Sequence, residues 1–292
     1  MNAGNMLLVI SILLFFRFQF VAALSLQGTN VLVTGSAGGI GKGIAVELAK
    51  ENGANVVLHY HQRRAEAEQL QLELGDNACL GILQCDFRKP ATLPDFIAQV
   101  HQLCQEKTGQ GLNILVNNAG VVSKMALEDD SDELSTWHET FAVNLIAPYL
   151  LSKLAMRESG GDLRTILHVS SIHGDRSNEY MGAYAASKAA LDSLTRTMAI
   201  EFASTNVRVN GIAPGVVPVE RTAAAFAYDA MRKSWEERIP LGLTGCVKEI
   251  AQACIPLLTN DWITGTVLQV DGGMMARANM PLRDRPPRLT SS

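Results

Sequence analysis

Three side chains near the middle of the chain have the types and the spacing needed to move a proton. Tyr184 and Lys188 are four residues apart, and Ser171 stands thirteen residues before the tyrosine. On a helix, positions i and i+4 share a face, so the phenol and the ammonium group can converge. A free tyrosine titrates near ~10, but a cation beside it favours the phenolate and lowers that pKa. The spacing therefore predicts an acid–base pair, with the Ser171 hydroxyl bonded to the same substrate oxygen.

A glycine-rich turn near the start of the chain indicates a nucleotide site. The sequence TGSAGGIG at 34–41 follows an apolar run and opens an amphipathic stretch. In that context the first glycine permits the tight turn, the second lets the backbone approach a pyrophosphate, and the third lets the helix pack close to the strand. The N-terminus of the helix offers N–H groups to the phosphates. The predicted cofactor contacts in this turn are Gly35, Ser36, Gly39, Ile40 and Gly41.

The residues after the second apolar run indicate which nicotinamide nucleotide is used. An NAD site usually has an acidic residue about 20 residues after the glycines, where it binds the ribose 2′-hydroxyl. This chain has two histidines, His59 and His61, and two arginines, Arg63 and Arg64, there instead, and such residues suit a 2′-phosphate. We therefore expect NADP(H) to be favoured over NAD(H). Asp86 ends the third apolar run, where it either accepts a hydrogen bond from the adenine amino group or caps a turn.

The elements that must position these residues alternate between two kinds. Continuous apolar runs, typical of parallel strands covered on both faces, occupy residues 31–34, 55–59, 80–84, 114–117, 165–169, 207–212 and 266–270. Amphipathic helices are expected at 40–50, 65–74, 93–107, 134–157, 184–203 and 248–258. This alternation predicts an α/β fold, a single Rossmann-type doubly wound parallel sheet of about seven strands with helices on both faces. Residues 216–244 interrupt the pattern and are expected to form an insertion over one end of the sheet.

The bulk composition limits the classes of function. Of 292 residues, 47% are hydrophobic and 18% are charged, which is enough apolar material for a large core. The net charge of −4 shows no basic excess, so we expect no nucleic-acid partner. The five cysteines are scattered without C-x-x-C spacing, so we expect neither a disulfide framework nor a metal site.

The two ends of the chain are expected to lie outside the catalytic domain, which we place at residues 28–276. Residues 1–27 contain the apolar run MLLVISILLFF at 6–16, with small residues at 21–23. The run has the length of a secretory signal core and falls short of an uninterrupted membrane span. Signal peptide, membrane anchor, organelle presequence and an extension without targeting value all stay open, and with them membrane association and localisation. Residues 277–292, rich in proline and arginine, are expected to be a disordered tail.

Taken together, these motifs resemble the classical short-chain dehydrogenases/reductases. The order and spacing of that family are matched by TGSAGGIG at 34–41, NNAG at 117–120, VNLIAP at 143–148, SSIHG at 170–174, YAASK at 184–188, APG at 213–215 and VDGG at 270–273. The match covers about residues 28–275. The resemblance implies a sheet ordered 3-2-1-4-5-6-7 and a homodimer or homotetramer built through the helices at 134–157 and 184–203. It also implies hydride transfer between the nicotinamide and a carbonyl or secondary alcohol.

The resemblance assigns roles to individual residues. Tyr184 matches the proton donor, Lys188 the residue that lowers its pKa and holds the nicotinamide ribose, and Ser171 the substrate-orienting serine. Asn144 matches the asparagine that helps to keep a proton-relay water. The remaining cofactor contacts implied are Asn118, Ala119 and Gly120 on the adenine-ribose side, and Pro214, Gly215 and Val217 near the nicotinamide.

The chain departs from the family pattern at several positions. Val219 stands where a threonine often contacts the cofactor carboxamide, and Gly38 where many NADP-dependent members carry a basic residue. The sequence LHYH at 58–61 is similar to pteridine reductases, but those enzymes have an arginine at the position of Gly39 and an acidic residue at that of Ser171. The expected substrate is therefore a small carbonyl or alcohol, such as a 3-oxoacyl thioester or a sugar or polyol. A pteridine-reductase-like enzyme and a catalytically silent, redox-sensing nucleotide-binding module are the alternatives.

Overall fold

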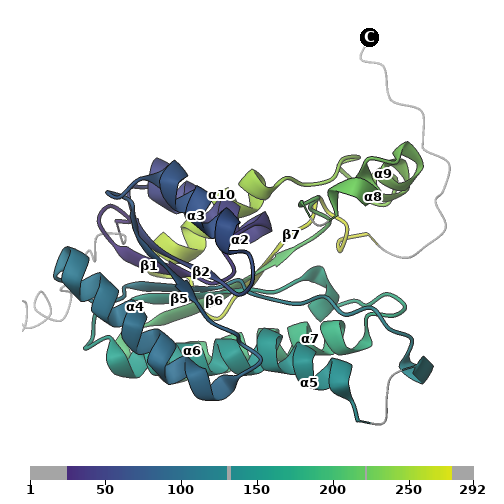
Figure 1. The fold of residues 1–292 in the computed structure, drawn as a ribbon. Coiled ribbons are helices and arrows are strands. Elements are labelled where there is room, and N and C mark those ends of the chain that lie inside the picture. Colours follow the sequence, from purple (N-terminus) through teal and green to yellow (C-terminus); the bar gives the residue numbers. More distant parts are fainter. Residues whose placement is uncertain (1–24, 130–132, 221, 278–292) are drawn as a thin grey trace, which may run out of the picture.

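The computed structural model describes residues 25–129, 133–220 and 222–277, and its centre is a seven-stranded parallel sheet (Figure 1). The strands are β1 (Asn30–Val33), β2 (Asn55–Tyr60), β3 (Cys79–Gln84), β4 (Ile114–Asn117), β5 (Thr165–Val169), β6 (Arg208–Pro214) and β7 (Val267–Val270). Their order is β3-β2-β1-β4-β5-β6-β7, and every adjacent pair is parallel. The predicted Rossmann-type fold and the strand order implied by the family resemblance are confirmed.

Helices cover both faces of the sheet (Figure 1). One layer contains α2 (Gly39–Val46), α3 (Arg64–Leu74) and α10 (Val247–Thr259), and the other contains α4 (Leu93–Thr108), α5 (Ser135–Phe141), α6 (Ala147–Glu158) and α7 (Gly182–Phe202). A separate apolar cluster fills the space under each layer. One joins α2 and α10 to the sheet, and the other joins α4 and α6 to it. This arrangement explains why most strands are apolar on both faces.

Two of the helices that the sequence predicted as continuous contain a π-helical turn. The first is η1 (Glu47–Glu51), which follows α2 directly. The second is η4 (Ala142–Ile146), which separates α5 from α6 within the predicted helix at 134–157. A π turn inserts one extra residue and rotates the side chains that follow it, and such turns often occur at functional sites. The second turn contains Asn144, one of the predicted catalytic residues.

The insertion predicted between the sixth strand and the last helix is present. Its described part includes two short helices, α8 (Ala223–Phe226) and α9 (Asp229–Glu236), which stand beyond the carboxyl ends of the strands (Figure 1). The base of the insertion is closed by a hydrogen bond from the Gly245 N–H to the Val216 carbonyl, with N···O 3.0 Å. We call α8, α9 and the residues that join them to β6 the α8–α9 lobe.

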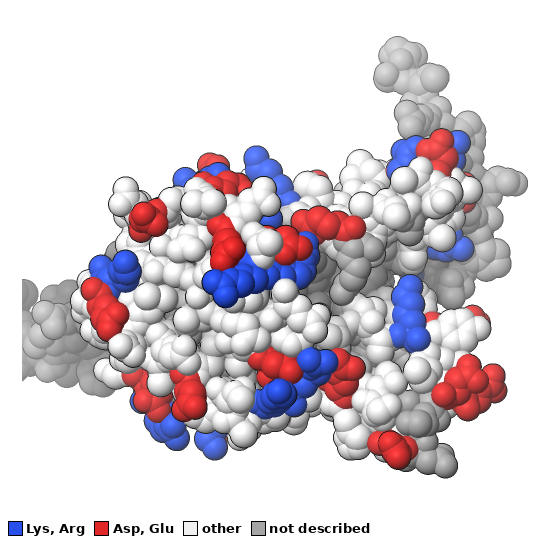
Figure 2. Space-filling model, in the orientation of Figure 1, with Lys and Arg blue, Asp and Glu red and all other residues white. Residues whose placement is uncertain are grey.

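The predictions for the two chain ends fall largely outside the described residues, which begin at Ser25 and end at Arg277. Leu26 is described, and it is 5% exposed in the apolar cluster under α2 and α10. Leu26 therefore packs against the domain that the sequence predicts at residues 28–276. In the described part of the chain, no helix combines the length and apolar character that a membrane span needs. Charges of both signs are interspersed over the face shown in Figure 2.

Candidate active site

A cavity of about 560 Å³ opens at the carboxyl ends of the strands, where β1 and β4 lie side by side and the chain connections diverge. This is the crevice in which open α/β sheets bind their ligands, and its volume suits a large small molecule. Twelve of the predicted site residues line it. They are Gly35, Gly39, Ile40, Gly41, His61, Arg63, Asp86, Asn118, Ala119, Gly120, Tyr184 and Lys188. The two groups of predicted residues, which lie far apart in the sequence, thus share one cavity.

The glycine turn between β1 and α2 has the shape that a pyrophosphate site requires. Gly35 and Gly39 have φ values of 66° and 56°, in the left-handed region that favours glycine. A Cβ on Gly41 would lie 2.3 Å from Asn118 Nδ2 and 2.5 Å from the Gly35 carbonyl oxygen. The backbone is therefore packed too closely for side chains, and the turn leads directly into the N-terminus of α2. These features fit the phosphates of a dinucleotide.

A buried histidine, which the sequence placed among the residues suited to a 2′-phosphate, instead fixes this turn. His59 on β2 accepts a hydrogen bond from the Gly35 N–H at Nδ1, with N···N 2.9 Å. Its Nε2 lies 3.1 Å from the Cys85 carbonyl oxygen, so the tautomer that satisfies both contacts is protonated at Nε2. The ring stacks on Phe87 with centroids 4.3 Å apart. Burial lowers the pKa of His59 to about 4, so the ring is neutral and keeps these contacts at physiological pH.

At the outer end of the cavity, Arg63 lies over the glycine turn. Its Nε donates to Glu66 Oε1, with N···O 2.9 Å. A Cβ placed on Gly38 would be only 2.3 Å from Arg63 Nη1. Gly38 thus leaves room for the guanidinium, which occupies the space that a basic side chain at position 38 would fill. Arg64, by contrast, is not among the residues that line the cavity; it pairs with Glu68 on the exposed side of α3, with N···O 2.8 Å.

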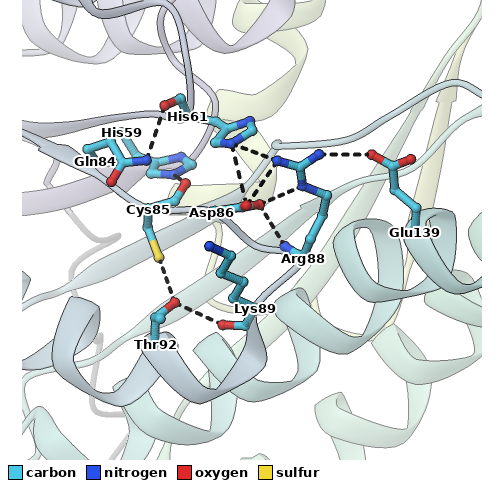
Figure 3. A network of polar contacts seen from close by, with 9 residues as sticks. All are labelled: His59, His61, Gln84, Cys85, Asp86, Arg88, Lys89, Thr92 and Glu139. Atoms are coloured by element: carbon cyan, nitrogen blue, oxygen red, sulfur yellow. Dashed lines mark hydrogen bonds and ion pairs between the residues drawn. The ribbon is translucent and has the colours of Figure 1, made fainter.

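At the same outer end of the cavity, Asp86 is the centre of a polar network (Figure 3). Arg88, which sequence reasoning missed, donates from Nε to Asp86 Oδ1 at 2.8 Å and from Nη2 to Oδ2 at 2.9 Å. Its guanidinium also lies 3.1 Å from His61 Nε2 and 3.6 Å from Glu139 Oε1. The Arg88 hydrogen bonds hold the pKa of Asp86 at about 2, against the opposing effect of burial. Asp86 is therefore ionised, and both of its oxygens already accept from Arg88.

At the inner end, α7 brings the predicted acid–base pair together. The Lys188 ammonium lies 5.9 Å from the centroid of the Tyr184 ring and donates to the Val169 carbonyl, with N···O 2.8 Å. The lysine is 4% exposed. Burial lowers its pKa to about 8, and the carboxylate of Asp192, one turn further along α7, opposes that shift. A cation held this close to the ring is the arrangement that lowers the pKa of a phenol.

Asn144 lies in the π turn and binds the loop that follows β4. Its Oδ1 accepts from the Val121 N–H, and its Nδ2 donates to the Val121 carbonyl, both at 2.9 Å. Nδ2 also lies 3.1 Å from the Ser187 hydroxyl, which donates to the Tyr184 carbonyl at 2.7 Å. The observed contacts join the loop to α7 beside the acid–base pair. The predicted role in holding a relay water stays a prediction.

Ser171 lies at the start of the short helix η5 (Ile172–Gly174), which packs against α7. Its hydroxyl accepts from the His173 N–H, with N···O 3.2 Å, and the His173 ring meets the Tyr184 ring edge to face at 5.9 Å. Ser171 is buried next to the cavity, whereas its neighbour Ser170 is among the lining residues.

The position of Asp192 explains why residue 174, in the motif SSIHG, is a glycine. A Cβ on Gly174 would be 2.5 Å from Asp192 Oδ2, so the glycine lets η5 lie against this carboxylate. Burial raises the pKa of Asp192, while Ser170 and Lys188 lower it. The only sequence signal for this residue is its position four residues after Lys188.

Four predicted cofactor residues besides Arg64 do not line the cavity. They are Ser36, Pro214, Gly215 and Val217. Ser36 is fully buried, and its hydroxyl accepts from the His59 N–H at 3.0 Å, so it stabilises the glycine turn by binding it to β2. Gly215 lies so close to β7 that a Cβ would be 2.7 Å from the Asp271 Cα. Further along the same segment, Val219 and Glu220 do line the cavity, and neither was predicted as a cofactor residue.

Comparison with known proteins agrees with this geometry. A family model described as enoyl-(acyl carrier protein) reductase matches residues 35–275. The 2-dehydro-3-deoxy-D-gluconate 5-dehydrogenase of Bacillus subtilis is 32% identical, covering 87% of this chain and 98% of that protein. The 3-oxoacyl-[acyl-carrier-protein] reductase FabG of Vibrio cholerae is 35% identical, covering 86% of this chain and 99% of that protein.

The fold likewise matches solved structures. A gluconate 5-dehydrogenase from Burkholderia cenocepacia, in complex with NADP and tartrate, has a TM-score of 0.76 and 28% identity, covering 86% of this chain and 97% of that chain. The family match extends over most of the chain and includes the glycine turn from Gly35 onward and the acid–base pair. The protein therefore belongs to the short-chain dehydrogenase/reductase family and is an oxidoreductase that acts on CH–OH or C=O groups.

Proposed function

We propose that the protein is an NADP(H)-dependent oxidoreductase that interconverts a carbonyl and a secondary alcohol on a small substrate. The observation that carries the cofactor preference is the Arg63 guanidinium over Gly38 at the outer end of the cavity. The turn after β2, which continues Tyr60-His61-Gln62-Arg63, contains no carboxylate to bind a ribose 2′-hydroxyl. A planar, permanently charged guanidinium suits a 2′-phosphate. The NADP in the Burkholderia structure supports the same choice.

The inner end of the cavity supports the proton-transfer half of the reaction. When bound, the nicotinamide supplies or accepts the hydride. In the direction of reduction, Tyr184 donates its phenolic proton to the carbonyl oxygen, and the product is the alcohol. Lys188 stabilises the phenolate through its charge, and the Ser171 hydroxyl holds the same oxygen in line. Asn144 fixes the loop at Val121 against α7, so that the substrate side of the cavity keeps its shape.

The relatives support two substrate classes. A 3-oxoacyl thioester is named for the Vibrio relative, and a sugar acid for the Bacillus one. Both offer a ketone or secondary alcohol to the same chemistry. We propose a substrate from the 3-oxoacyl-thioester class or from the sugar and polyol class, including their acids.

The test is NADPH oxidation, with NADH in parallel, over a panel of 3-oxoacyl thioesters, keto-sugar acids, simple ketones and a pteridine. We expect turnover of one carbonyl class with NADPH preferred. Tyr184→Phe should lower kcat by about 10²- to 10⁴-fold and leave NADPH affinity unchanged, because only the proton donor is lost.

Three outcomes would contradict the proposal in whole or in part. Tight NADPH binding without turnover of any panel member would indicate a nucleotide-binding module instead of an enzyme. A preference for NADH would remove the assigned role of Arg63 while leaving the reaction type intact. Turnover of the pteridine alone would favour the pteridine-reductase-like alternative.

A further inference from the structure

A carboxylate already lies at the N-terminus of α2, where the phosphates of a cofactor are expected to bind. Glu220, from the α8–α9 lobe, accepts a hydrogen bond from the Gly39 N–H, with N···O 2.9 Å. Gly39 is the first residue of α2, whose eight residues begin at the glycine turn. The N-terminus of a helix carries a partial positive charge and unpaired N–H groups, and both attract an anion. Glu220 therefore occupies the position where a pyrophosphate would be expected.

The contact includes more than the one hydrogen bond. Val219 and Glu220 both line the cavity together with the glycine turn and with Tyr184 and Lys188. A Cβ on Gly39 would be 3.5 Å from Val219 Cγ1 and 4.0 Å from Glu220 Oε2, so both side chains lie directly over the turn. One N–H group on a tight turn cannot donate fully to two anions, and two anions at this distance repel each other. The carboxylate and a pyrophosphate therefore exclude one another here.

The residue before Glu220, Val219, is hydrogen-bonded to Thr222 at the start of α8. The Val219 N–H donates to Thr222 Oγ1 at 3.0 Å, and the Thr222 N–H donates to the Val219 carbonyl at 2.8 Å. Thr222 directly precedes α8, and the Phe226 N–H donates to the Thr222 carbonyl at 3.2 Å. Helix α8 in turn packs on α9. A displacement of Glu220 is thereby transmitted to α8 and α9.

We propose that Glu220 is a built-in competitor for the cofactor. Its carboxylate holds the α8–α9 lobe against the glycine turn, and it must leave before the pyrophosphate of NADP(H) binds there. Cofactor binding is then coupled to displacement of the lobe, and Glu220 lowers the affinity for the cofactor. This inference rests on the proposed function, because it assumes that a dinucleotide binds at the glycine turn.

The first experiment measures NADPH affinity by fluorescence or calorimetry in the wild type, Glu220→Gln and Glu220→Asp. Glu220→Gln removes the competing charge, and we expect the Kd for NADPH to fall about two- to fivefold, the usual size of a charge effect at an exposed helix N-terminus. Glu220→Asp keeps the charge but shortens the side chain, so it should also bind NADPH more tightly than the wild type does. Glu237→Gln, which makes the same charge change beyond α9, is the control and should not alter the Kd.

The outcomes separate the alternatives. An unchanged or higher Kd in Glu220→Gln would overturn the inference, because Glu220 would then be a bystander or a cofactor ligand. A gain in Glu220→Gln with none in Glu220→Asp would also overturn it, because the effect would come from charge at a distance. Failure of the wild type to bind either NADPH or NADH would instead overturn the proposed function, on which the inference rests.

The second experiment follows the lobe itself by hydrogen exchange. In the absence of cofactor, the amide hydrogens of α8 and α9 should exchange faster in Glu220→Ala than in the wild type, because the contact with Gly39 is lost. NADPH should change the exchange of these helices in the wild type and much less in Glu220→Ala. Equal exchange in the two cofactor-free proteins would show that Glu220 does not hold the lobe, and would overturn the coupling.

Discussion

The two ends of the cavity are built in different ways. At the inner end, Lys188 and Asn144 are buried, and their polar atoms bind backbone groups at fixed positions. At the outer end, the side chains of Arg63 and Arg88 are 47% and 42% exposed, and they bind the carboxylates of Glu66 on α3 and of Asp86. A charge in a dry environment has strong effects on its neighbours, whereas exposed ion pairs contribute little to stability. We therefore propose that the inner end controls the chemistry and that the outer end binds an arriving anion.

This difference predicts the largest effect at the inner end. Lys188→Met removes the ammonium beside Tyr184 but keeps a side chain of similar length. We expect kcat to fall by about 10²- to 10⁴-fold, because the phenol loses the charge that favours its ionised form. The fold should survive, since desolvation of a buried cation is costly, and its removal offsets the loss of the hydrogen bond to the Val169 carbonyl. Steady-state kinetics and thermal melting check both points. A large fall in Tm would mean that the lysine has mainly a structural role.

The second effect belongs to the outer end and should change affinity, not chemistry. Arg63→Met removes the guanidinium over Gly38. We expect NADPH affinity to fall about 10- to 100-fold, the usual value of a hydrogen-bonded charge pair, while NADH affinity stays constant. Binding measured with both nucleotides checks this. Arg64→Met, an equal change of charge outside the cavity, is the matched control, and an equal loss in both variants would contradict the role given to Arg63.

The parts of the site that lie on regular helices and strands could be predicted from the sequence, and the parts on irregular segments could not. The spacing of Tyr184 and Lys188 was sufficient to predict that their side chains converge, because both lie on one regular helix, α7. The seven strands were predicted because their apolar runs are continuous. The π turn at Asn144 was not, since its sequence resembles an ordinary helix. Arg88 and Glu220 reach the cavity from irregular segments, where no periodic pattern fixes the direction of a side chain. The contact of Glu220 with Gly39 joins segments far apart in the sequence, so it depends on tertiary structure alone.

A third, smaller effect tests whether the inner end works through electrostatics. The pKa of Lys188 lies near 8, lowered by burial and supported by the Asp192 carboxylate. If reduction needs the ammonium, activity is full below that pH and is lost as the pH rises through it. Asp192→Asn removes a charge that favours the ammonium, so the pKa should fall and the alkaline limb of the pH–rate profile should move about one unit lower.

Glu201→Gln is the control for this effect, because it makes an equal change of charge at an exposed position on the same helix. Its pH profile should match that of the wild type. An alkaline limb that stays in place in Asp192→Asn would indicate that Asp192 serves only to position η5 through its contact at Gly174. The contrast between the two ends would then be one of packing, not of charge.

The smallest effect tests the outer end through a residue without a side chain. In Gly38→Ala, the new Cβ would be 2.3 Å from Arg63 Nη1, so the guanidinium must move. The cost to the fold should be small, because Gly38 has an extended φ of 176° and a long side chain can shift. We expect NADPH affinity to fall about two- to fivefold, which is less than 1 kcal/mol, with NADH affinity unchanged.

The double variant Gly38→Ala/Arg63→Met makes this prediction specific. If the alanine acts only by displacing the guanidinium, it has nothing left to displace once Arg63 is gone. The double variant should then bind NADPH as weakly as Arg63→Met alone, because two changes that act through one contact are not additive. Additive losses would mean that Gly38 affects the cofactor directly, through the backbone of the glycine turn. In that case the specificity of the outer end would depend partly on the rigid turn and not on the exposed arginine alone.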